Sequence, residues 1–480
     1  MKKKELTPEH LRKRALKKER EIAKWEKEKA RPKRSYYFAY LVFIITLIYA
    51  TDEIASQIGT LMKTEIANDL FSKFGNSSVS AINILSILVV PFQALGLLYR
   101  PLADKLGRKK FLIINTFGMS LAMLVIFLSN NILLYFAGAC LVQFFIPHDM
   151  HVVYIMESSP AKHRARMYST IKFFANMSVM LVPVLRDYLM TATSQWRRVY
   201  LIPAIVGLVV SFIAIMLARE TDTFIDSRLN HLRKTDEEIE REKLEKKTSE
   251  AQGGLIPALK FAMSHKQLRW LFITATIANF GFIASIDYQV IMSYGYAESI
   301  FHSAEKFAVD AVGIGAVTDA LYLFPVGCAV SQVVMGFISD AKGRKAAALV
   351  TAFDCLVCFV GFWLGAIYNW SPAIVGLLCG GFVGSFYSTN DVLIMMIGES
   401  APTNLRSSVM AAEFLPVGVG VGLSYAISLP LSAILGNQFI GIIALCMLVP
   451  GFAIALVTLA KKTHDTKGID LDTVTGAEWD

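Results

Sequence analysis

The sequence predicts an all-α membrane protein whose twelve transmembrane helices form two six-helix bundles. The first observation is composition: 54% of the 480 residues are hydrophobic and mean hydropathy is +0.47, which is too apolar for a soluble globule. The second is repetition, because the charged segment 104–109 recurs 236 residues later at 340–345. The third is a Glu followed seven residues later by Arg, found at 157 and 164 and again at 399 and 406. Two motifs repeated in nearly one register indicate an internal duplication.

The apolar runs are each long enough to cross a hydrocarbon core of about 30 Å, which takes roughly 20 residues of helix. The first six lie near 36–62, 79–99, 110–129, 132–156, 168–190 and 198–218. The second six lie near 268–294, 312–337, 346–367, 372–397, 407–431 and 438–460. In one of these runs Gly376, Gly380 and Gly384 recur every four residues, which predicts the close approach of a neighbouring helix.

The remaining segments are charged and divide the chain into five parts. These are a basic N-terminal tail (1–34), an N-terminal bundle (35–218), a linker (219–266), a C-terminal bundle (267–460) and a C-terminal tail (461–480). Alternating charge predicts that the linker is a solvated helix. The N-terminal tail is also expected to be helical, either solvated or resting on anionic lipid.

Charge placement predicts topology. Residues 1–34 hold 15 Lys and Arg against six Glu, an excess equal to the net charge of +9 of the whole chain. The other cations mostly flank spans, so the positive-inside rule places both termini in the cytoplasm of a plasma membrane or bacterial inner membrane. Arg197 and Arg198 are exceptions. Cations at membrane boundaries indicate a lipid bilayer and not nucleic acid as the partner, and we expect a monomer.

All six cysteines fall inside apolar runs, so the sequence predicts neither a disulfide framework nor a metal site. No catalytic motif of the Ser-His or zinc-protease type lies in the spans, and we expect no enzyme activity. The cofactor prediction is likewise none, apart from a proton as coupling ion.

The repeated motifs predict a gate built from ion pairs on the cytoplasmic side. An acid at the end of one span, a glycine turn and an Arg-Lys pair at the start of the next place opposite charges close together. Exchange of such pairs can bias one conformation over another. The predicted gating residues are Asp104, Gly107, Arg108, Glu157, Arg164, Gly336, Asp340, Gly343, Arg344, Glu399 and Arg406.

These motifs resemble those of the major facilitator superfamily, and the chain is most similar to its branch of sugar and metabolite porters, which includes proton symporters. The pattern G-x-x-x-D-x-x-G-R-K is complete at Gly336–Lys345, whereas Arg100 replaces its first glycine in the other half. Asp465-Thr466-Lys467-Gly468 stands where sugar porters carry Glu-Thr-Lys-Gly. The resemblance implies the major facilitator fold with pseudo-two-fold symmetry and transport by alternating access.

Acids inside the spans predict the working site, because an ionisable group at membrane depth is costly and marks a pathway or site. Asp52 and Asp287 are 235 residues apart, and Asp149 and Asp391 are 242 apart. We expect these four repeat-related carboxylates to line one hollow near the midplane. The candidates for proton coupling are Asp52, Glu53, Asp149, Glu413, His148 and His151.

The predicted solute is a small polar metabolite such as a sugar, polyol or related carbon source, imported with protons. Candidate residues of the substrate cavity are Asp287, Asp391, Gln143, Asn176, Tyr288, Gln289, Asn390 and Trp363. One alternative is an exporter of organic cations or drugs, which the surplus of acids in the spans favours. Another is a nutrient receptor that does not transport. An organic anion is disfavoured, because the predicted midplane lacks an arginine.

Overall fold

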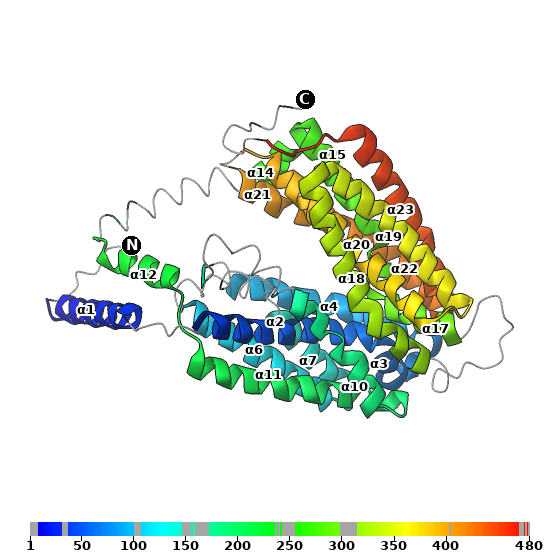
Figure 1. The fold of residues 1–480 in the computed structure, drawn as a ribbon, viewed down its shortest axis with the longest axis horizontal. Coiled ribbons are helices and arrows are strands. Elements are labelled where there is room, and N and C mark those ends of the chain that lie inside the picture. Colours follow the sequence, from blue (N-terminus) through cyan, green and yellow to red (C-terminus); the bar gives the residue numbers. More distant parts are fainter. Residues whose placement is uncertain are drawn as a thin grey trace.

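A computed structural model describes residues 8–30, 37–99, 107–145, 154, 157–158, 171, 173–235, 238, 241, 255–297, 314–402, 405–469, 475 and 478. The described residues form helices and short turns, with no strand among them. The helices make two bundles that meet at one end and diverge at the other (Figure 1). The fold class predicted from the sequence is confirmed.

The N-terminal bundle is built around α6, which packs against α2, α7 and α11. Its helices are α2 (Tyr37–Leu61), α3 (Lys63–Leu70), η1 (Ser72–Ser77), α4 (Ser78–Tyr99), α6 (Arg108–Phe127), α7 (Ile132–Phe145), α10 (Leu181–Leu189), η4 (Thr193–Gln195) and α11 (Arg197–Leu217). Residues 173–178 are also helical and precede α10. The first span is interrupted at Met62, so that α3 continues it as a separate short helix.

The C-terminal bundle is built around α20, which packs against α18 and α19. Its helices are α14 (Leu255–Ser264), α15 (Lys266–Ala278), η5 (Asn279–Gly281), α16 (Phe282–Ile286), α17 (Tyr288–Ala297), α18 (Ile314–Lys342), α19 (Arg344–Ile367), α20 (Pro372–Glu399), α21 (Arg406–Ala412), α22 (Phe414–Leu435), η7 (Asn437–Phe439) and α23 (Ile440–Lys462). The span that contains α15 to α17 breaks at Asp287, where the backbone leaves helical geometry.

Ten helices of the described chain are long and apolar enough to cross a membrane, and α7 is a shorter apolar helix. These eleven fall on predicted spans. Residues 173–189 account for the described part of the twelfth. The six-plus-six arrangement expected from the duplication therefore agrees with the structure.

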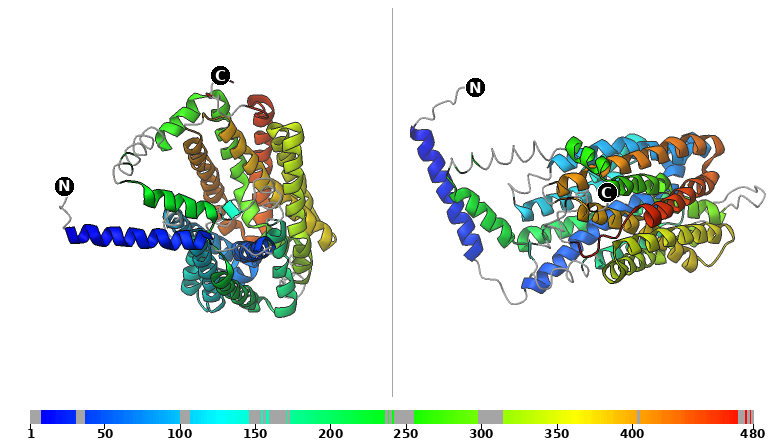
Figure 2. Two further views of the ribbon diagram at one scale, coloured as in Figure 1. Left: turned by 60° about the vertical axis from the view of Figure 1, so that its left-hand side comes forward. Right: turned by 90° about the horizontal axis from the view of Figure 1, so that it is seen from above.

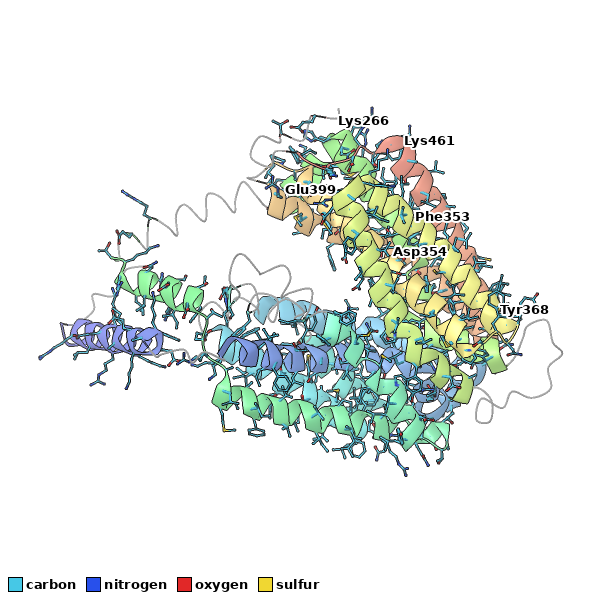
Figure 3. The ribbon with its side chains drawn as sticks, in the orientation of Figure 1. Lys266, Phe353, Asp354, Tyr368, Glu399 and Lys461 are labelled. Atoms are coloured by element: carbon cyan, nitrogen blue, oxygen red, sulfur yellow. The ribbon has the colours of Figure 1, made fainter. Side chains whose placement is uncertain are left out.

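The two ends of the bundles differ in chemistry. We call one the basic end, where α6 and α19 begin and where Lys266, Glu399 and Lys461 lie (Figure 3). Tyr368 lies at the opposite end, which we call the closed end (Figure 3). There the bundles contact each other through α3 with α17, α10 with α18 and α4 with α22. Hydrogen bonds between Ser80 and Ser432 (2.6 Å) support this contact.

The exception to the charge rule, Arg197, belongs to the closed end. Its guanidinium pairs with Asp69 at 2.7 Å and lies over the ring of Trp196, 4.8 Å from the centroid. Trp196 in turn donates its indole N–H to Asp69 at 2.9 Å. A local acid and an aromatic ring thus stabilise this cation at the closed end.

Helix α1 (Pro8–Ala30) packs on helix α12 (Asp222–Arg233) beyond the basic end. Figure 2 shows α1 running across the direction of the bundle helices. The rings of Trp25 and Phe224 meet edge to face at 5.6 Å, and Arg228 pairs with Glu21 at 2.7 Å. The hydrogen bond from Arg228 lowers the pKa of Glu21, so this pair stabilises the contact at neutral pH and is lost as the pH falls through that pKa. The predicted helix is confirmed, and one of its faces binds the linker helix.

The repeated motifs form the same ion pair in each half. Arg108 Nε lies 3.1 Å from Glu157 Oε1, and Arg344 Nε lies 3.1 Å from Glu399 Oε1. We call these two contacts the latch pairs. Each joins the start of one span to the glutamate of the E-x6-R motif in the same bundle, so the duplication extends to individual atoms.

An acid-threonine pair after the last span of each half completes the latch. Thr221 donates its hydroxyl hydrogen to Glu157 at 2.5 Å, and Thr466 donates to Glu399 at 2.5 Å. The preceding acids, Glu220 and Asp465, accept from the backbone N–H groups at the starts of α6 and α19, at 3.0 and 3.2 Å. Of these two pairs, only Asp465-Thr466 is marked by the sequence resemblance. Each acid-threonine pair holds the last span of its bundle against the third span of the same bundle.

Gly107 and Gly343 are required at these positions for two reasons. Both have φ near +105°, a conformation that costs L-residues with a Cβ. In addition, a Cβ on either glycine would collide with the carboxylate of Glu220 or Asp465, at 2.2 and 1.8 Å. The repeated glycine therefore lets an acid reach the helix start.

The other predicted gating residues have different roles. Arg406 donates to the carbonyl of Gly398 at 2.9 Å, and Asp340 pairs with Arg344 at 3.2 Å. Gly336 was predicted as a gating residue, and a Cβ there would meet nothing within 4 Å in this conformation, in which the bundles diverge at the basic end. Its part in gating stays a prediction. Asp104 and Arg164 lie outside the described residues.

The glycine stripe of α20 makes the predicted close contact, and its partner is α18. A Cβ on Gly376 or Gly380 would lie 1.9 or 2.0 Å from the carbonyl oxygen of Ala320 or Phe324. Because backbone cannot move aside as a flexible side chain does, these positions accept only glycine. The contact fixes α18 and α20 as one rigid unit inside the C-terminal bundle.

We expect Gly380→Ala to destabilise the protein by about 1–3 kcal/mol, because overpacking a tight contact forces backbone shifts. The matched control is Gly422→Ala on α22, where a Cβ would meet nothing within 4 Å. That change should leave stability unchanged or slightly raised. Thermal unfolding midpoints of both variants in the same detergent measure the difference. Equal midpoints would show that α18 and α20 are not in contact through this stripe.

The latch pairs should be energetically coupled. In a double-mutant cycle of Arg344→Gln and Glu399→Gln, we expect a coupling energy of about 0.5–3 kcal/mol, because the residues share one network. The cycle of Arg108→Gln and Glu157→Gln should give the same sign and a similar size. Unfolding midpoints of the six variants supply both energies. Additive effects in either half would contradict the pairing.

Candidate functional site

A cavity of about 1030 Å³ lies between the two bundles. It is lined by α2, α3, α4, α7 and α11 on one side and by α16 and α22 on the other. Its walls are mostly apolar. The polar groups concentrate on the first span, where Ser56, Thr60 and Lys63 follow each other at helical spacing. A large apolar cavity with a few convergent polar groups is the usual form of a ligand site.

Further polar side chains reach the cavity from other helices. Gln143 on α7 is one of them, as the sequence predicted. Ser86 on α4 and the phenol groups of Tyr135, Tyr200 and Tyr425 also line it. The described lining thus offers hydroxyl and amide groups against an apolar background.

The closed end of the cavity is formed by a buried ion pair between the bundles. Lys63 Nζ lies 2.5 Å from Asp287 Oδ1, and the two side chains are 7% and 1% exposed. Lys63 also donates to the carbonyl of Ile286 at 3.2 Å. The second carboxylate oxygen of Asp287 accepts from Asn83 Nδ2 at 2.8 Å. Both charged groups are therefore paired and hydrogen bonded, as buried charges must be.

A second buried ion pair lies beside the first. Arg186 Nη2 is 2.5 Å from Glu65 Oε1, with side-chain exposures of 0% and 3%. The guanidinium also donates to the carbonyl of Leu61 at 3.1 Å and to Thr318 Oγ1 at 3.2 Å. Thr318 belongs to α18, so this pair of the N-terminal bundle also reaches the other bundle.

Gln289 adds a further contact between the bundles beside the two ion pairs. Its carbonyl oxygen accepts from the N–H and the hydroxyl of Thr64, both at 2.9 Å. Its amide nitrogen donates to Glu65 Oε2 at 3.1 Å. The side chain is fully buried. We call the set of Lys63, Glu65, Asn83, Arg186, Asp287 and Gln289 the closed-end network.

Breaks in two spans place this network. Lys63 and Glu65 lie in the first turn of α3, just after the interruption at Met62. Asp287 caps the C-terminus of α16, where its span is interrupted. Such discontinuous helices are typical of membrane transport folds, because interrupted backbone is tolerated only where it is buried or lines a cavity.

The four repeat-related acids do not converge as expected. Asp287 pairs with Lys63, which lies 11 residues beyond Asp52 along the first span. At 1.5 Å per residue this is roughly 16 Å, so Asp52 and Asp287 are at different depths. Asp391 is exposed on α20. The prediction of one shared hollow is wrong for Asp287, and Asp149 lies outside the described residues.

The proton-coupling candidates are only partly described. Asp52 is buried, at 6% exposed. Glu53 is partly exposed and close enough to α18 to act electrostatically on Cys328. Glu413 is 7% exposed and interacts electrostatically with Asp391. Their role in coupling stays a prediction, and His148 and His151 lie outside the described residues.

Two predicted amide residues form hydrogen bonds between helices. Asn176 Nδ2 donates to Gln332 Oε1 at 3.2 Å, which links the two bundles. Asn390 Oδ1 accepts from Asn279 Nδ2 at 2.7 Å inside the C-terminal bundle. Both are partly buried. Neither is among the residues that line the cavity.

The two aromatic candidates pack inside the C-terminal bundle. Tyr288 is 1% exposed, and its ring stacks on Phe324 at 4.6 Å. Trp363 contacts Gly441 of α23, where a Cβ would lie 2.6 Å from the indole nitrogen. Neither is among the described residues that line the cavity, so the expectation that they belong to the substrate cavity does not hold in this conformation. They are core residues, as large aromatic side chains usually are.

Sequence reasoning missed most of the closed-end network. It named Asp287 and Gln289 as candidates, but not Lys63, Glu65, Asn83 or Arg186. A usable signal was the charged segment Lys63-Thr64-Glu65 at the end of the first apolar run. Within the described chain no group of three or more His, Cys, Asp or Glu side chains is arranged to hold a metal ion.

Solved structures share the fold at low sequence identity. The inward open conformation of the xylose transporter from E. coli is similar with a TM-score of 0.61 and 16% identity, covering 92% of this chain and 99% of that one. A bacterial homologue of the human lysosomal transporter Spinster, inward-facing and unoccupied, gives a TM-score of 0.59 and 13% identity, covering 90% and 98%. At these identities the likeness concerns the fold alone.

Curated relatives match only part of the chain. A facilitated glucose transporter homologue of Caenorhabditis elegans is 31% identical over 141 residues, which are 28% of this chain and 25% of that protein. Facilitated glucose transporter member 4 of solute carrier family 2 from Homo sapiens is 30% identical over 109 residues, 22% of this chain and 21% of that protein. The matches thus span about a quarter or less of these relatives.

The family comparison covers most of the sequence. The sequence model of the Major Facilitator Superfamily matches residues 35–415, which include the N-terminal bundle and the C-terminal bundle as far as α22. The chain therefore belongs to the Major Facilitator Superfamily, and it is a multi-pass membrane protein.

Proposed function

We propose that this protein is a secondary transporter that carries a small polyhydroxylated metabolite, such as a sugar or a related carbon source, by alternating access with proton coupling. The observation that carries the proposal is the cavity of about 1030 Å³ between two duplicated bundles, sealed by the closed-end network. The bundles diverge at the other end (Figure 1). A central site with one closed end is what alternating access requires.

The comparisons support a sugar-like solute. Structures of the same fold include one titled D-xylose-proton symporter, with a TM-score of 0.59 and 13% identity, and the partial relatives are glucose transporters. The hydroxyl and amide groups on the cavity wall suit a polyhydroxylated solute, because each offers hydrogen bonds at low electrostatic cost. We propose a transporter and not an enzyme, acting as a monomer on a single solute.

The charge distribution supports the orientation. We propose that the basic end faces the cytoplasm, because α1, the latch pairs and Lys461 and Lys462 all lie there, in agreement with the positive-inside rule. The protein would then reside in a plasma membrane or bacterial inner membrane with both termini inside. In this orientation the structure is closed toward the outside.

An exporter of organic cations remains the second candidate. The observation in its favour is Asp391 on α20 near Glu413, two acids that interact electrostatically. The lining of the cavity disfavours a cationic solute, because among the described lining residues the only charged side chain is itself a cation, Lys63.

The function is tested by uptake into proteoliposomes, with and without an inward proton gradient. The panel contains D-glucose, D-xylose, sorbitol, D-glucuronate and tetraphenylphosphonium. We expect the gradient to drive accumulation of at least one polyhydroxylated solute and not of tetraphenylphosphonium. Accumulation of the organic cation alone, or of no solute, would refute the proposal.

Filling the cavity should stop transport without unfolding the protein. We expect Thr60→Trp to reduce uptake at least tenfold, because the larger side chain occupies the cavity that Thr60 lines. The matched control is Val357→Trp, at an exposed position of α19 that does not line the cavity. Uptake by Thr60→Trp at the control's rate would show that the solute passes elsewhere.

A further inference from the structure

The ion pair of Lys63 and Asp287 must break whenever the closed end opens. Lys63 belongs to the N-terminal bundle and Asp287 to the C-terminal bundle. Glu65 and Arg186, by contrast, both belong to the N-terminal bundle and can stay paired when the bundles separate. This inference rests on the proposed function, because alternating access is what requires the separation.

Opening would remove the described partners of both charges at once. The acceptors of Lys63 are Asp287 and the carbonyl of Ile286, which are both in the C-terminal bundle. The donors to Asp287 are Lys63 and Asn83, which are both in the N-terminal bundle. Leaving a buried charge without its partner is strongly unfavourable. Each group therefore needs a replacement partner in the open state.

For Asp287 a proton can take the place of the lost cation, because a neutral carboxyl group leaves no charge to be buried. The groups that face it are Lys63 from α3, Asn83 from α4 and Tyr425 from α22. Of these only Lys63 carries a positive charge. Glu65 lies two residues beyond Lys63 on α3, and Arg186 neutralises it.

For Lys63 the replacement is the solute. Lys63 lies at the closed end of the cavity and is the only charged side chain among its described lining residues. Ser56 and Thr60 line the same cavity seven and three residues earlier in the first span, and so add hydroxyl groups beside the cation. A neutral sugar would leave the ammonium group without a counter-charge. A carboxylate would supply one and a charge-assisted hydrogen bond.

We propose that the solute is a sugar acid, a polyhydroxylated monocarboxylate, whose carboxylate takes the place of Asp287 on Lys63 while Asp287 binds a proton. One proton and one monoanion then enter together, and no net charge crosses the membrane. From sequence alone an organic anion is disfavoured, because the predicted midplane lacks an arginine. Lys63 supplies the missing cation from the end of the first span.

The test uses the full chain in proteoliposomes with radiolabelled D-glucuronate and D-glucose, which share the ring and differ in the carboxylate. We expect D-glucuronate to be taken up with an apparent affinity at least tenfold higher. Accumulation should follow a pH gradient and should not change when valinomycin and potassium set the membrane potential. D-Glucose uptake that excess D-glucuronate does not inhibit would overturn the proposal and leave the proposed transport function standing.

The variants assign the two charges. Asp287→Asn should exchange D-glucuronate across the membrane but lose its accumulation in a pH gradient. The double variant Lys63→Met with Asp287→Asn removes both charges, so it leaves neither one buried without the other and is expected to fold. It should lose D-glucuronate exchange at least tenfold. Lys73→Met, which removes an exposed lysine of η1 near the closed end, is the control and should behave as the wild type.

Binding gives a readout independent of transport. D-Glucuronate should raise the thermal unfolding midpoint of the wild type and of Lys73→Met, because a ligand that binds the folded state stabilises it. It should not raise that of the double variant. An equal rise in all three would overturn the role of Lys63. Movement of none of the sugars, polyols or sugar acids would refute the proposed function as well.

Discussion

The arrangement of the two bundles depends on burying charge without leaving a charged group unmatched. An ionised side chain removed from water costs several kcal/mol even after relaxation, and its partner repays this only if the remaining hydrogen bonds are also made. At the closed end Asp287 uses both oxygens on donors of the other bundle, and Glu65 uses both oxygens on Arg186 and Gln289. The bundles thus meet where complementary groups match, and not through general apolar adhesion, which lipid would supply equally well.

The latch pairs have a different part in the structure. Each one lies within a single bundle and joins its third span to the glutamate of the E-x6-R motif. That glutamate also accepts from the threonine that follows the last span of the same bundle. Together with the glycine contact between α18 and α20, these contacts make each bundle rigid. Rigid bundles can only move as whole bodies, so a change at one end of the molecule is transmitted to the other.

Much of this fold is readable from the sequence, for a physical reason. A span must be about 20 apolar residues long and a duplicated motif repeats its spacing, so the number of helices, the two bundles and the pairing of Arg344 with the E-x6-R motif follow from local patterns. The tight packing at Gly380 follows similarly from a four-residue repeat. Such features depend on neighbours in the chain or on the symmetry of the duplication.

The site is less predictable, because its residues obey neither rule. Asp287 was expected to lie near Asp52, the residue related to it by the duplication. It forms its ion pair with Lys63 instead, and Lys63 is not one of the residues that the duplication relates. The helix breaks at Met62 and Asp287 bring Lys63 and Asp287 together. No proline or glycine stands at either break, so the sequence gives no local signal that predicts it. Tyr288 and Trp363 are aromatic residues of the kind that can stack on a sugar ring, but both pack against other side chains inside the C-terminal bundle. Long-range pairing of this kind becomes visible only in three dimensions.

The difference between contacts within a bundle and contacts between bundles explains how one chain can be both stable and switchable. Interactions within a bundle are retained in every state, so they can be numerous and strong without opposing motion. Interactions between bundles must be exchanged in each cycle, and a strong pair such as Lys63 and Asp287 would trap the closed state unless something replaced it. A free-energy cost of about 3–5 kcal/mol for leaving a buried charge unpaired is large enough to favour the closed state of the empty protein at this end. It is small enough for a bound solute and a proton to offset, because a charge-assisted hydrogen bond contributes about 1.5–3 kcal/mol and neutralisation of Asp287 removes the cost of its burial. The strength of the closed-end pair therefore makes opening conditional on the solute.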